Sequence, residues 1–271
     1  MTLNFREALA ALAHAFPAYL YYAVALIFGG LVILLEFGFF LVAIRLARVE
    51  RSMAAPLLFG AILLGGWLTL LAWQRLFLFR RQAVMLCLFS KDDAGQAQAM
   101  ARRLFPSFSA WSGCNRRLRQ ALQALVRDGD SGSGPTRGFV GRMAATAFSP
   151  AIFSLSFARG GETAAITEAL ALYWRHGQKT RSLGERWLWF SVAGFVLLFL
   201  CLALANALVF SGAGAPIAIG VALAAVIAWA IHQAFVAPLA LAGVSASLLD
   251  ETRSREPDDD LCARISPLLT P

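Results

Sequence analysis

The residues best suited to chemistry in this chain are polar groups set inside long apolar stretches. Glu36 is the only charged residue in residues 8–44, while His232, Gln233 and Asn206 lie in stretches that contain no charged residue. Polar groups in such surroundings are costly to maintain, so each is a candidate for function. The chemistry that they could support is the binding or passage of an ion, a proton or a small solute.

Each of these candidates also has a purely structural interpretation. A carboxylate at Glu36 must be paired, protonated or exposed to water, so it could hold an ion, a proton or a cationic substrate. Alternatively, it pairs with another helix or lies near a membrane interface. His232, Gln233 and Asn206 could line a pathway, or could form hydrogen bonds between helices, which contribute about 1 kcal/mol each.

Four apolar stretches must position these side chains, and each is long enough to cross a bilayer. Residues 53–74, 187–210 and 215–249 carry no Asp, Glu, Lys or Arg, and residues 8–44 carry only Glu36. A bilayer core about 30 Å thick needs roughly 20 such residues in a helix. With 59% hydrophobic residues and a mean hydropathy of +0.65, the chain is predicted to be an all-α integral membrane protein with four transmembrane helices.

The four stretches group into two transmembrane hairpins, at residues 17–74 and 187–249. The last stretch is longer than a bilayer is thick, so it must tilt, extend beyond the membrane or kink, and Pro238 is the expected kink site. Residues 250–271 form a short cytoplasmic tail with six acidic residues against three Arg.

An amphipathic helix is expected at residues 1–16, before the first hairpin. Four of its apolar residues are spaced to share one face: Leu3, Leu9, Leu12 and Phe16. A helix of this kind lies in the plane of the membrane interface.

An Arg-rich region, residues 75–186, separates the two hairpins and is expected to be cytoplasmic or interfacial. It contains 17 Lys and Arg against 7 Asp and Glu. Within it, residues 115–127 form an amphipathic helical pattern that carries four arginines: Arg116, Arg117, Arg119 and Arg127. This pattern is typical of a helix on an anionic membrane surface, where the arginines contact lipid. The alternative is a helix whose apolar face packs on the rest of the protein.

Residues 138–157 in the same region are apolar but contain Arg142, Pro150 and several serines. A charge and a proline both cost energy in lipid, so a re-entrant or interfacial element is favoured over a fifth span.

Enzymatic chemistry is not indicated. The chain has no phosphate-binding loop, no GxSxG or HExxH motif, and only three scattered histidines, so no catalytic site, cofactor or metal is expected. Its four cysteines stand far apart and form no CxxC pair, which favours free thiols.

The net charge of +8 could suggest nucleic acid as a partner, but the chain contains no nucleic-acid recognition motif. Cytoplasmic loops of membrane proteins commonly collect Lys and Arg, which accounts for the charge. Nucleic acid is therefore not an expected partner.

The loops also predict an orientation. The link between the last two apolar stretches, SGAGAP, has no charge and belongs outside, so the Arg-rich region and the C-terminus belong in the cytoplasm. With four spans the N-terminus is cytoplasmic too. One link, residues 45–52, then lies outside although it contains three Arg. The expected location is the bacterial inner (plasma) membrane.

Residues 160–260 contain a distinct order of parts: ETAAITEALALYWRHGQKTRSLGERW, the span WLWFSVAGFVLLFLCLALANALVF, a short link, AIGVALAAVIAWAIHQAFVAPLALAGVSASLL and the tail DETRSREPDDD. This order resembles the C-terminal half of choline transporter-like membrane proteins and of uncharacterised bacterial relatives. The resemblance implies an all-helical membrane fold that needs a partner or a second copy to complete a pathway. Transport of choline is not implied, because no substrate-binding residue can be matched.

Two functions follow from these features. The first is a non-enzymatic subunit of a homo- or hetero-oligomeric membrane assembly, favoured by the small size of the chain and its sparse intramembrane polarity. Small residues spaced four apart, such as Ala203 and Ala207, would let helices approach closely in such an assembly. The alternative is a transporter or channel component that moves a small solute or ion. Lipid is an expected partner in both.

Overall fold

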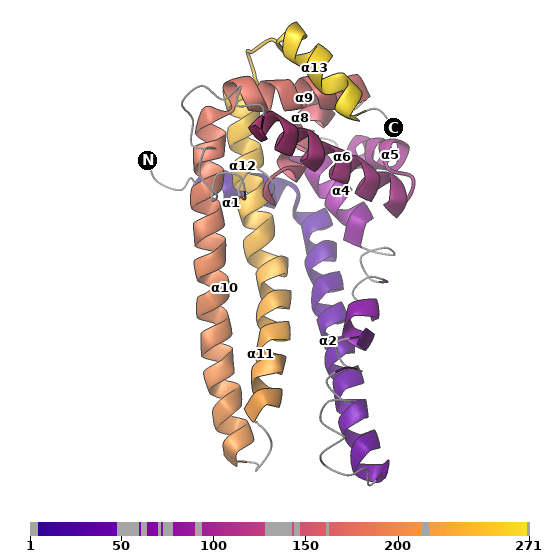
Figure 1. Cartoon of the computed structure of the whole chain (residues 1–271), viewed down its shortest axis with the longest axis vertical. Helices are drawn as coiled ribbons and strands as arrows, with labels where there is room; N and C mark the ends of the chain where they lie inside the picture. The colour runs from indigo at the N-terminus through magenta and orange to yellow at the C-terminus, as the bar shows by residue number, and fades with distance from the viewer. Residues whose placement is uncertain are drawn as a thin grey trace. The chain divides into compact units, whose positions relative to one another are not determined.

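The structure is a computed structural model that describes residues 5–47, 60, 64–69, 72, 78–89, 94–127, 143, 147–160, 163–212 and 217–269. All regular secondary structure in these residues is helical, which confirms the predicted all-α class for this part of the chain. The helices in chain order are α1 (Phe5–His14), α2 (Phe16–Ala47), α4 (Phe79–Leu88), α5 (Ala94–Leu104), α6 (Phe108–Arg127), α8 (Pro150–Ala158), α9 (Thr163–His176), α10 (Gln178–Gly212), α11 (Ile217–Ile231), the π-helix η3 (His232–Val236), α12 (Ala237–Thr252) and α13 (Asp259–Leu269) (Figure 1).

Two segments are long and apolar enough to cross a membrane, Gln178–Leu208 and Leu223–Thr252. A third candidate arises if α1 and the first part of α2, which meet at a 90° bend, form one span. The described residues thus contain two to three candidate spans, and the prediction of four spans is not confirmed. Its second span, residues 53–74, falls largely outside the described residues.

The two long C-terminal helices differ in detail from the sequence prediction. Helix α10 begins at Gln178, nine residues before the predicted start at residue 187. Residues 178–186 include Lys, Arg, Leu and Glu, which favour helix, so the helix continues although its apolar character ends. A π-helix, η3, precedes Pro238 and ends two residues before that proline, while the kink expected at Pro238 stays a prediction.

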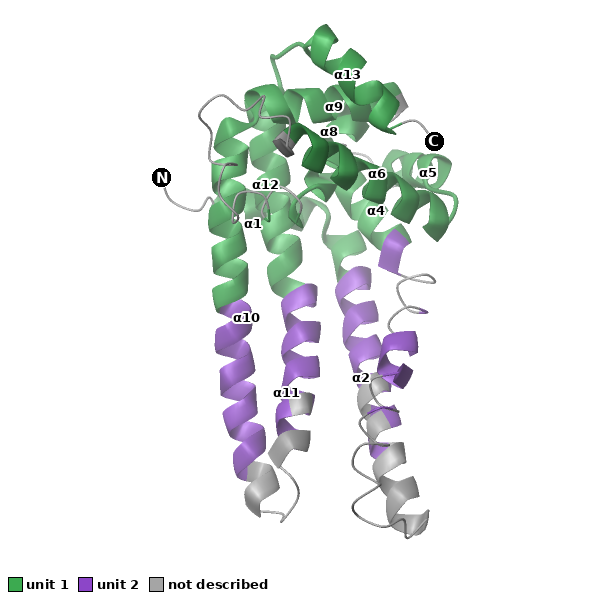
Figure 2. Ribbon diagram, in the orientation of Figure 1, with its two compact units in different colours: residues 1–20, 80–193, 235–271 green, residues 21–79, 194–234 purple. Residues whose placement is uncertain are grey.

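Contacts divide the chain into two compact units (Figure 2). The first comprises Met1–Leu20, Arg80–Ala193 and Phe235–Pro271. Helix α12 runs through the core of this unit and packs against α1, α8 and α9. A buried hydrogen bond of 3.3 Å from Ser154 Oγ of α8 to Ser245 Oγ of α12 fixes one of these contacts.

Helix α8 is the most deeply enclosed element of the first unit. Its residues from Pro150 to Phe157 are all buried, and Phe153 and Phe157 pack against the rings of Phe105 and Trp111. This helix makes up the last part of residues 138–157, where a re-entrant or interfacial element was predicted. Burial among other helices accounts for its apolar composition without any contact with lipid. Residues 138–142, including Arg142, lie outside the described residues.

The C-terminal segment, predicted simply as an acidic tail, contains the packed helix α13. Leu261, Ile265 and Leu269 are buried, and α13 contacts α6 and α9. The helix is capped by Asp258, whose Oδ1 accepts a hydrogen bond of 3.2 Å from the backbone N–H of Leu261. The acidic residues thus begin a helix, where negative charge is favourable.

The second unit comprises Tyr21–Phe79 and Gly194–Ala234. Within it, α2 approaches the C-terminal end of α11 closely, because a Cβ atom added at Gly30 would lie 3.3 Å from Cβ of Ala230. The expectation that small residues allow close helix packing is met at this point. Phe195 and Phe199 stack along α10, with ring centroids 6.4 Å apart.

Helix α10 exposes its apolar surface along most of its length. None of its most apolar 18-residue window is buried within the chain, whereas a third of the corresponding window in Leu223–Thr252 is buried. Four strongly exposed leucines form a row: Leu197, Leu200, Leu204 and Leu208, at 57–66% exposure. A row of this kind is unfavourable in water, so it must be covered by lipid or by protein.

Candidate functional site

Glu36, the strongest sequence candidate, is paired with a hydroxyl group. The side chain of Thr69 donates to the Glu36 carboxylate, with Oγ1 at 2.9 Å from Oε1 and 3.1 Å from Oε2. Gly65 lies one turn before Thr69, and a Cβ atom added there would be 3.8 Å from Oε2. The carboxylate therefore faces the segment 64–69. This is the interhelical pairing that the sequence left open, and it places Glu36 in a helix–helix contact.

His232 is the first residue of the π-helix η3. Its ring is half-buried and meets the ring of Phe195 edge to face, with centroids 5.6 Å apart. A π-helix inside a longer helix frequently marks a functional position. Gln233, the next residue, is also half-buried. The two polar side chains thus lie at the irregular turn of the last candidate span.

Asn206 is satisfied within its own helix. Its side-chain N–H donates to the carbonyl oxygen of Leu202 at 2.8 Å, one turn earlier in α10. A side chain that bonds to its own helix backbone needs no ligand to satisfy it. The contacts described for Glu36, His232 and Asn206 involve three different partners, Thr69, Phe195 and Leu202.

The arginines proposed to contact anionic lipid all lie on α6. Arg116 and Arg119 are exposed and Arg117 is half-buried, whereas the side chain of Arg127 lies outside the part of the chain that the structure describes. The apolar face of α6 is buried in the first unit, through Leu118, Ala121, Leu122 and Leu125. Of the two alternatives for this helix, packing on the protein is therefore found. Contact of the arginines with lipid stays a prediction.

A polar junction that was not predicted joins α9, α10 and α12. Arg181 of α10 donates from Nη1 to the carbonyl oxygens of Tyr173 and Trp174, the first at 2.8 Å, at the C-terminal end of α9. Its guanidinium also lies over both rings, 5.9 Å and 5.4 Å from their centroids. Burial raises the pKa of Tyr173 to about 12, while the nearby Arg181 acts in the opposite direction. Arginine at the end of a helix offsets the partial negative charge of its carbonyls.

Glu251 completes this junction from the C-terminal end of α12. Its carboxylate accepts hydrogen bonds from the backbone N–H groups of Lys179 and Thr180 at 3.0 and 2.9 Å, and from Thr180 Oγ1 at 2.8 Å. Glu251 therefore caps the N-terminus of α10, where free N–H groups favour negative charge. In the sequence, Gly177 between two helical patterns and Thr180 three residues later indicate the start of a helix. Neither residue identifies Glu251 as the partner, because Glu251 is 71 residues from Thr180.

Trp187 marks the transition in α10 from charged to apolar residues. It is fully buried and lies against Gly243 of α12, where an added Cβ atom would be only 2.9–3.0 Å from the indole ring. The indole Nε1 has no hydrogen-bond partner among the described residues. The two helices therefore pack closely at Trp187 and Gly243.

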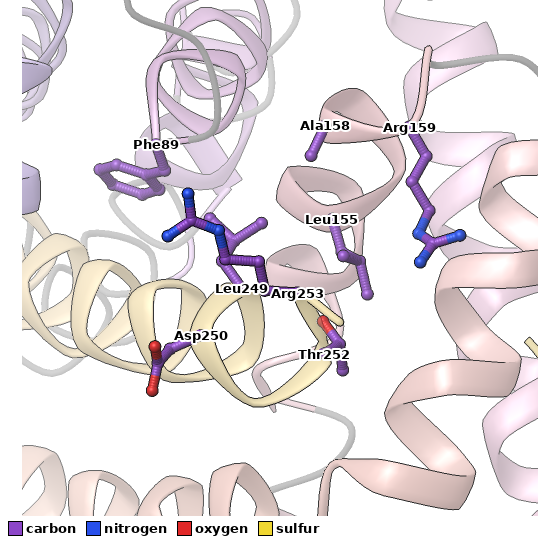
Figure 3. A pocket seen from close by; sticks show the side chains of 8 residues that line it. All are labelled: Phe89, Leu155, Ala158, Arg159, Leu249, Asp250, Thr252 and Arg253. Atoms are coloured by element: carbon purple, nitrogen blue, oxygen red, sulfur yellow. The ribbon is translucent and has the colours of Figure 1, made fainter. Parts of the chain in front are cut away.

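A pocket of about 480 Å³ in the first unit lies where α4, α8 and α12 end (Figure 3). The Arg253 guanidinium lies on the side of Phe89, and that of Arg159 points away from it. Arg159 donates to the carbonyl oxygen of Arg255 at 2.9 Å and forms an ion pair of 3.5 Å with Glu168. Arg159 is therefore held by contacts within the first unit.

Neither a known protein family, nor a curated protein, nor a solved structure matches the chain. The class defined by the fold and these contacts is therefore an all-helical protein with two to three candidate membrane-spanning helices. The resemblance to choline transporter-like proteins stays a prediction.

Proposed function

We propose that this chain is a non-enzymatic, multi-pass subunit of a homo- or hetero-oligomeric assembly in the bacterial inner membrane. The observation that carries the proposal is the exposed apolar surface of α10, whose most apolar window contains no buried residue. Spanning helices associate through van der Waals packing rather than through a hydrophobic force, so an uncovered face is available for another helix.

Two further observations support assembly over transport. Ala203 and Ala207 lie half-buried beside the exposed leucine row, where small side chains permit a partner helix to approach closely. In addition, Glu36 and Asn206 already have partners within the chain, so fewer polar groups are left for a pathway. Orientation follows from charge: the Arg-rich region and both termini lie in the cytoplasm, as positive loops do.

The test is the mass of the purified protein in lipid nanodiscs, with any co-purifying protein identified. A stable oligomer or a defined partner supports the proposal, and a monomer at all concentrations contradicts it. The variant Leu197→Ala/Leu204→Ala should shift the complex toward monomer, because it removes packing surface from the exposed row of α10. The control is Leu35→Ala in α2, at a residue that is also strongly exposed. Equal loss of the complex in both variants would contradict a specific role for α10.

The alternative is a transporter or channel component, and the π-helix at His232 is the observation that favours it. A histidine and a glutamine at an irregular turn of a candidate span are typical of a pathway lining. In a liposome flux assay, Glu36→Gln and His232→Ala should then abolish transport and leave the mass of the complex unchanged. Flux equal to that of the wild type in both variants would exclude this role for the two residues.

A further inference from the structure

We propose that α1 is half-submerged in the bilayer surface, with lipid acyl chains covering an apolar face that contains Leu9 and Ala13. This proposal rests on the proposed membrane function and identifies lipid as the partner of one particular helix face. It differs from a simple amphipathic helix at the interface, because the structure buries one apolar face of α1 against α12 and leaves another apolar surface, at Leu9, exposed.

The first apolar face of α1 is covered by protein. Ala8 and Leu12 are buried, as is Ala15 at the end of the helix, and α12 is the helix that α1 contacts most extensively. Leu12 was expected to share its surroundings with Leu9, but the two differ. Leu12 is 8% exposed and Leu9 is 55% exposed.

The second apolar face lies between the buried face and the polar face. At about 100° per residue, Leu9 is roughly 60° from Leu12 on one side and roughly 60° from Arg6 on the other. Ala13, one turn beyond Leu9, is exposed as well and lies roughly 40° from Leu9 and roughly 20° from Arg6, at the edge of the polar face. The polar face carries Arg6 and His14, both exposed. A helix with protein, apolar and polar sectors in this order fits the corner between a helical bundle, a bilayer and water.

The position of α1 along α10 agrees with this corner. The Phe5 ring meets the rings of Trp187 and Phe190 edge to face, with centroids 5.0 and 5.3 Å apart. These two aromatic residues stand where the charged residues 179–186 give way to the charge-free part of α10. Aromatic side chains concentrate at this level of a membrane protein. The 90° bend between α1 and α2 then lays α1 along the surface when α2 crosses the membrane.

Lipid acyl chains are favoured over an anionic headgroup as the ligand of this face. Arg6 and Glu7 are adjacent and opposite in charge, so α1 offers no basic cluster to attract phosphate. A second copy of the chain is the competing occupant, and the experiment distinguishes it from lipid.

The experiment places the photoreactive residue p-benzoylphenylalanine in the full chain, in place of Leu9, Ala13, Ala10 or Leu200 in turn. Each protein is reconstituted in vesicles of phosphatidylethanolamine and phosphatidylglycerol, irradiated and analysed by mass spectrometry. Positions 9 and 13 should form adducts with lipid acyl chains. Position 10 is exposed on the polar side and is the matched control, where most of the lipid adduct should be lost.

The outcomes separate this proposal from the proposed function. Lipid adducts at position 200 but not at positions 9 and 13 would overturn the proposal for α1 and leave the membrane function standing. Adducts of positions 9 and 13 with a second copy of the chain would also overturn it. The absence of both lipid and protein adducts at position 200 would contradict the membrane function itself. Equal lipid labelling at positions 9 and 10 would show that α1 has no distinct lipid face.

Discussion

Replacing Gly243 with alanine tests whether the contact of α12 with Trp187 is as close as the geometry indicates. The added Cβ atom would lie 2.9 Å from Nε1 and 3.0 Å from both Cε2 and Cζ2 of a fully buried indole. Carbon atoms do not approach so closely, and the rigid ring cannot move a single terminal atom out of the way. The two helices must therefore separate or the indole must leave its place.

The expected magnitude is the difference of two effects. Overpacking of a buried site costs about 1–3 kcal/mol, and alanine favours helix over glycine by about 1 kcal/mol. Gly243→Ala should thus lower the free energy of unfolding by as much as about 2 kcal/mol. Gly194→Ala in α10 is the matched control, because no atom of another described helix lies within 4 Å of its added Cβ. This control gains helix propensity without a clash and should stabilise the protein slightly.

The assay is thermal unfolding in detergent, followed by tryptophan fluorescence, with both variants measured in the same detergent. A change of 1 kcal/mol corresponds to a shift of a few degrees for a chain of this size. Combining Gly243→Ala with Trp187→Phe should recover part of the loss, since the smaller ring gives space to the new methyl group. Equal melting temperatures for the Gly243 and Gly194 variants would refute the close contact and the reasoning built on it.

Three further outcomes are expected from the described contacts. Glu251→Ala removes the cap of α10 and should lower stability by about 1–2 kcal/mol in chemical denaturation, whereas the exposed Glu256→Ala should have no effect. Because burial raises the pKa of Tyr173 from 10.0 to about 12, its phenol ionises first in the unfolded chain, so stability should fall as pH rises from 10 to 12. A Tyr173→Phe protein should lack this part of the alkaline loss when unfolding is followed against pH. Thr69→Val removes the hydroxyl donor of Glu36 and should cost about 1–3 kcal/mol, and Thr69→Ser should restore the stability; equal stability of the two proteins would show that the hydrogen bond contributes nothing.

Residues 187–210 and 215–249 were recognisable as long helices because a run without charge of that length has few other uses in a protein. The sequence was less informative about α8, which is as apolar as a lipid-facing segment but lies within the protein core. Apolar composition reports that a segment avoids water, and it does not say whether lipid or protein replaces the water. Residues 138–157 were therefore predicted to be re-entrant or interfacial on the same signal that makes α8 a core helix.

The polar contacts were harder to predict than the helices. Glu36 could be identified as a residue that needs a partner, but Thr69, which supplies the hydroxyl, is 33 residues away in the sequence. The junction of Arg181 and Glu251 depends on two helix ends meeting in space. Spacing within one helix cannot indicate such a meeting, because only tertiary packing brings the ends together.

The π-helix at His232–Val236 has a consequence for the rotational phase of the last helix. Each π-turn holds one more residue than an α-turn, so residues beyond it are rotated by about 100° from where an unbroken α-helix would place them. The side chains of α11 and those of α12 therefore follow separate angular registers along the chain. A substitution pattern that is periodic along α11 will fall out of phase along α12. Mutational scans of this helix must accordingly be phased on either side of residues 232–236.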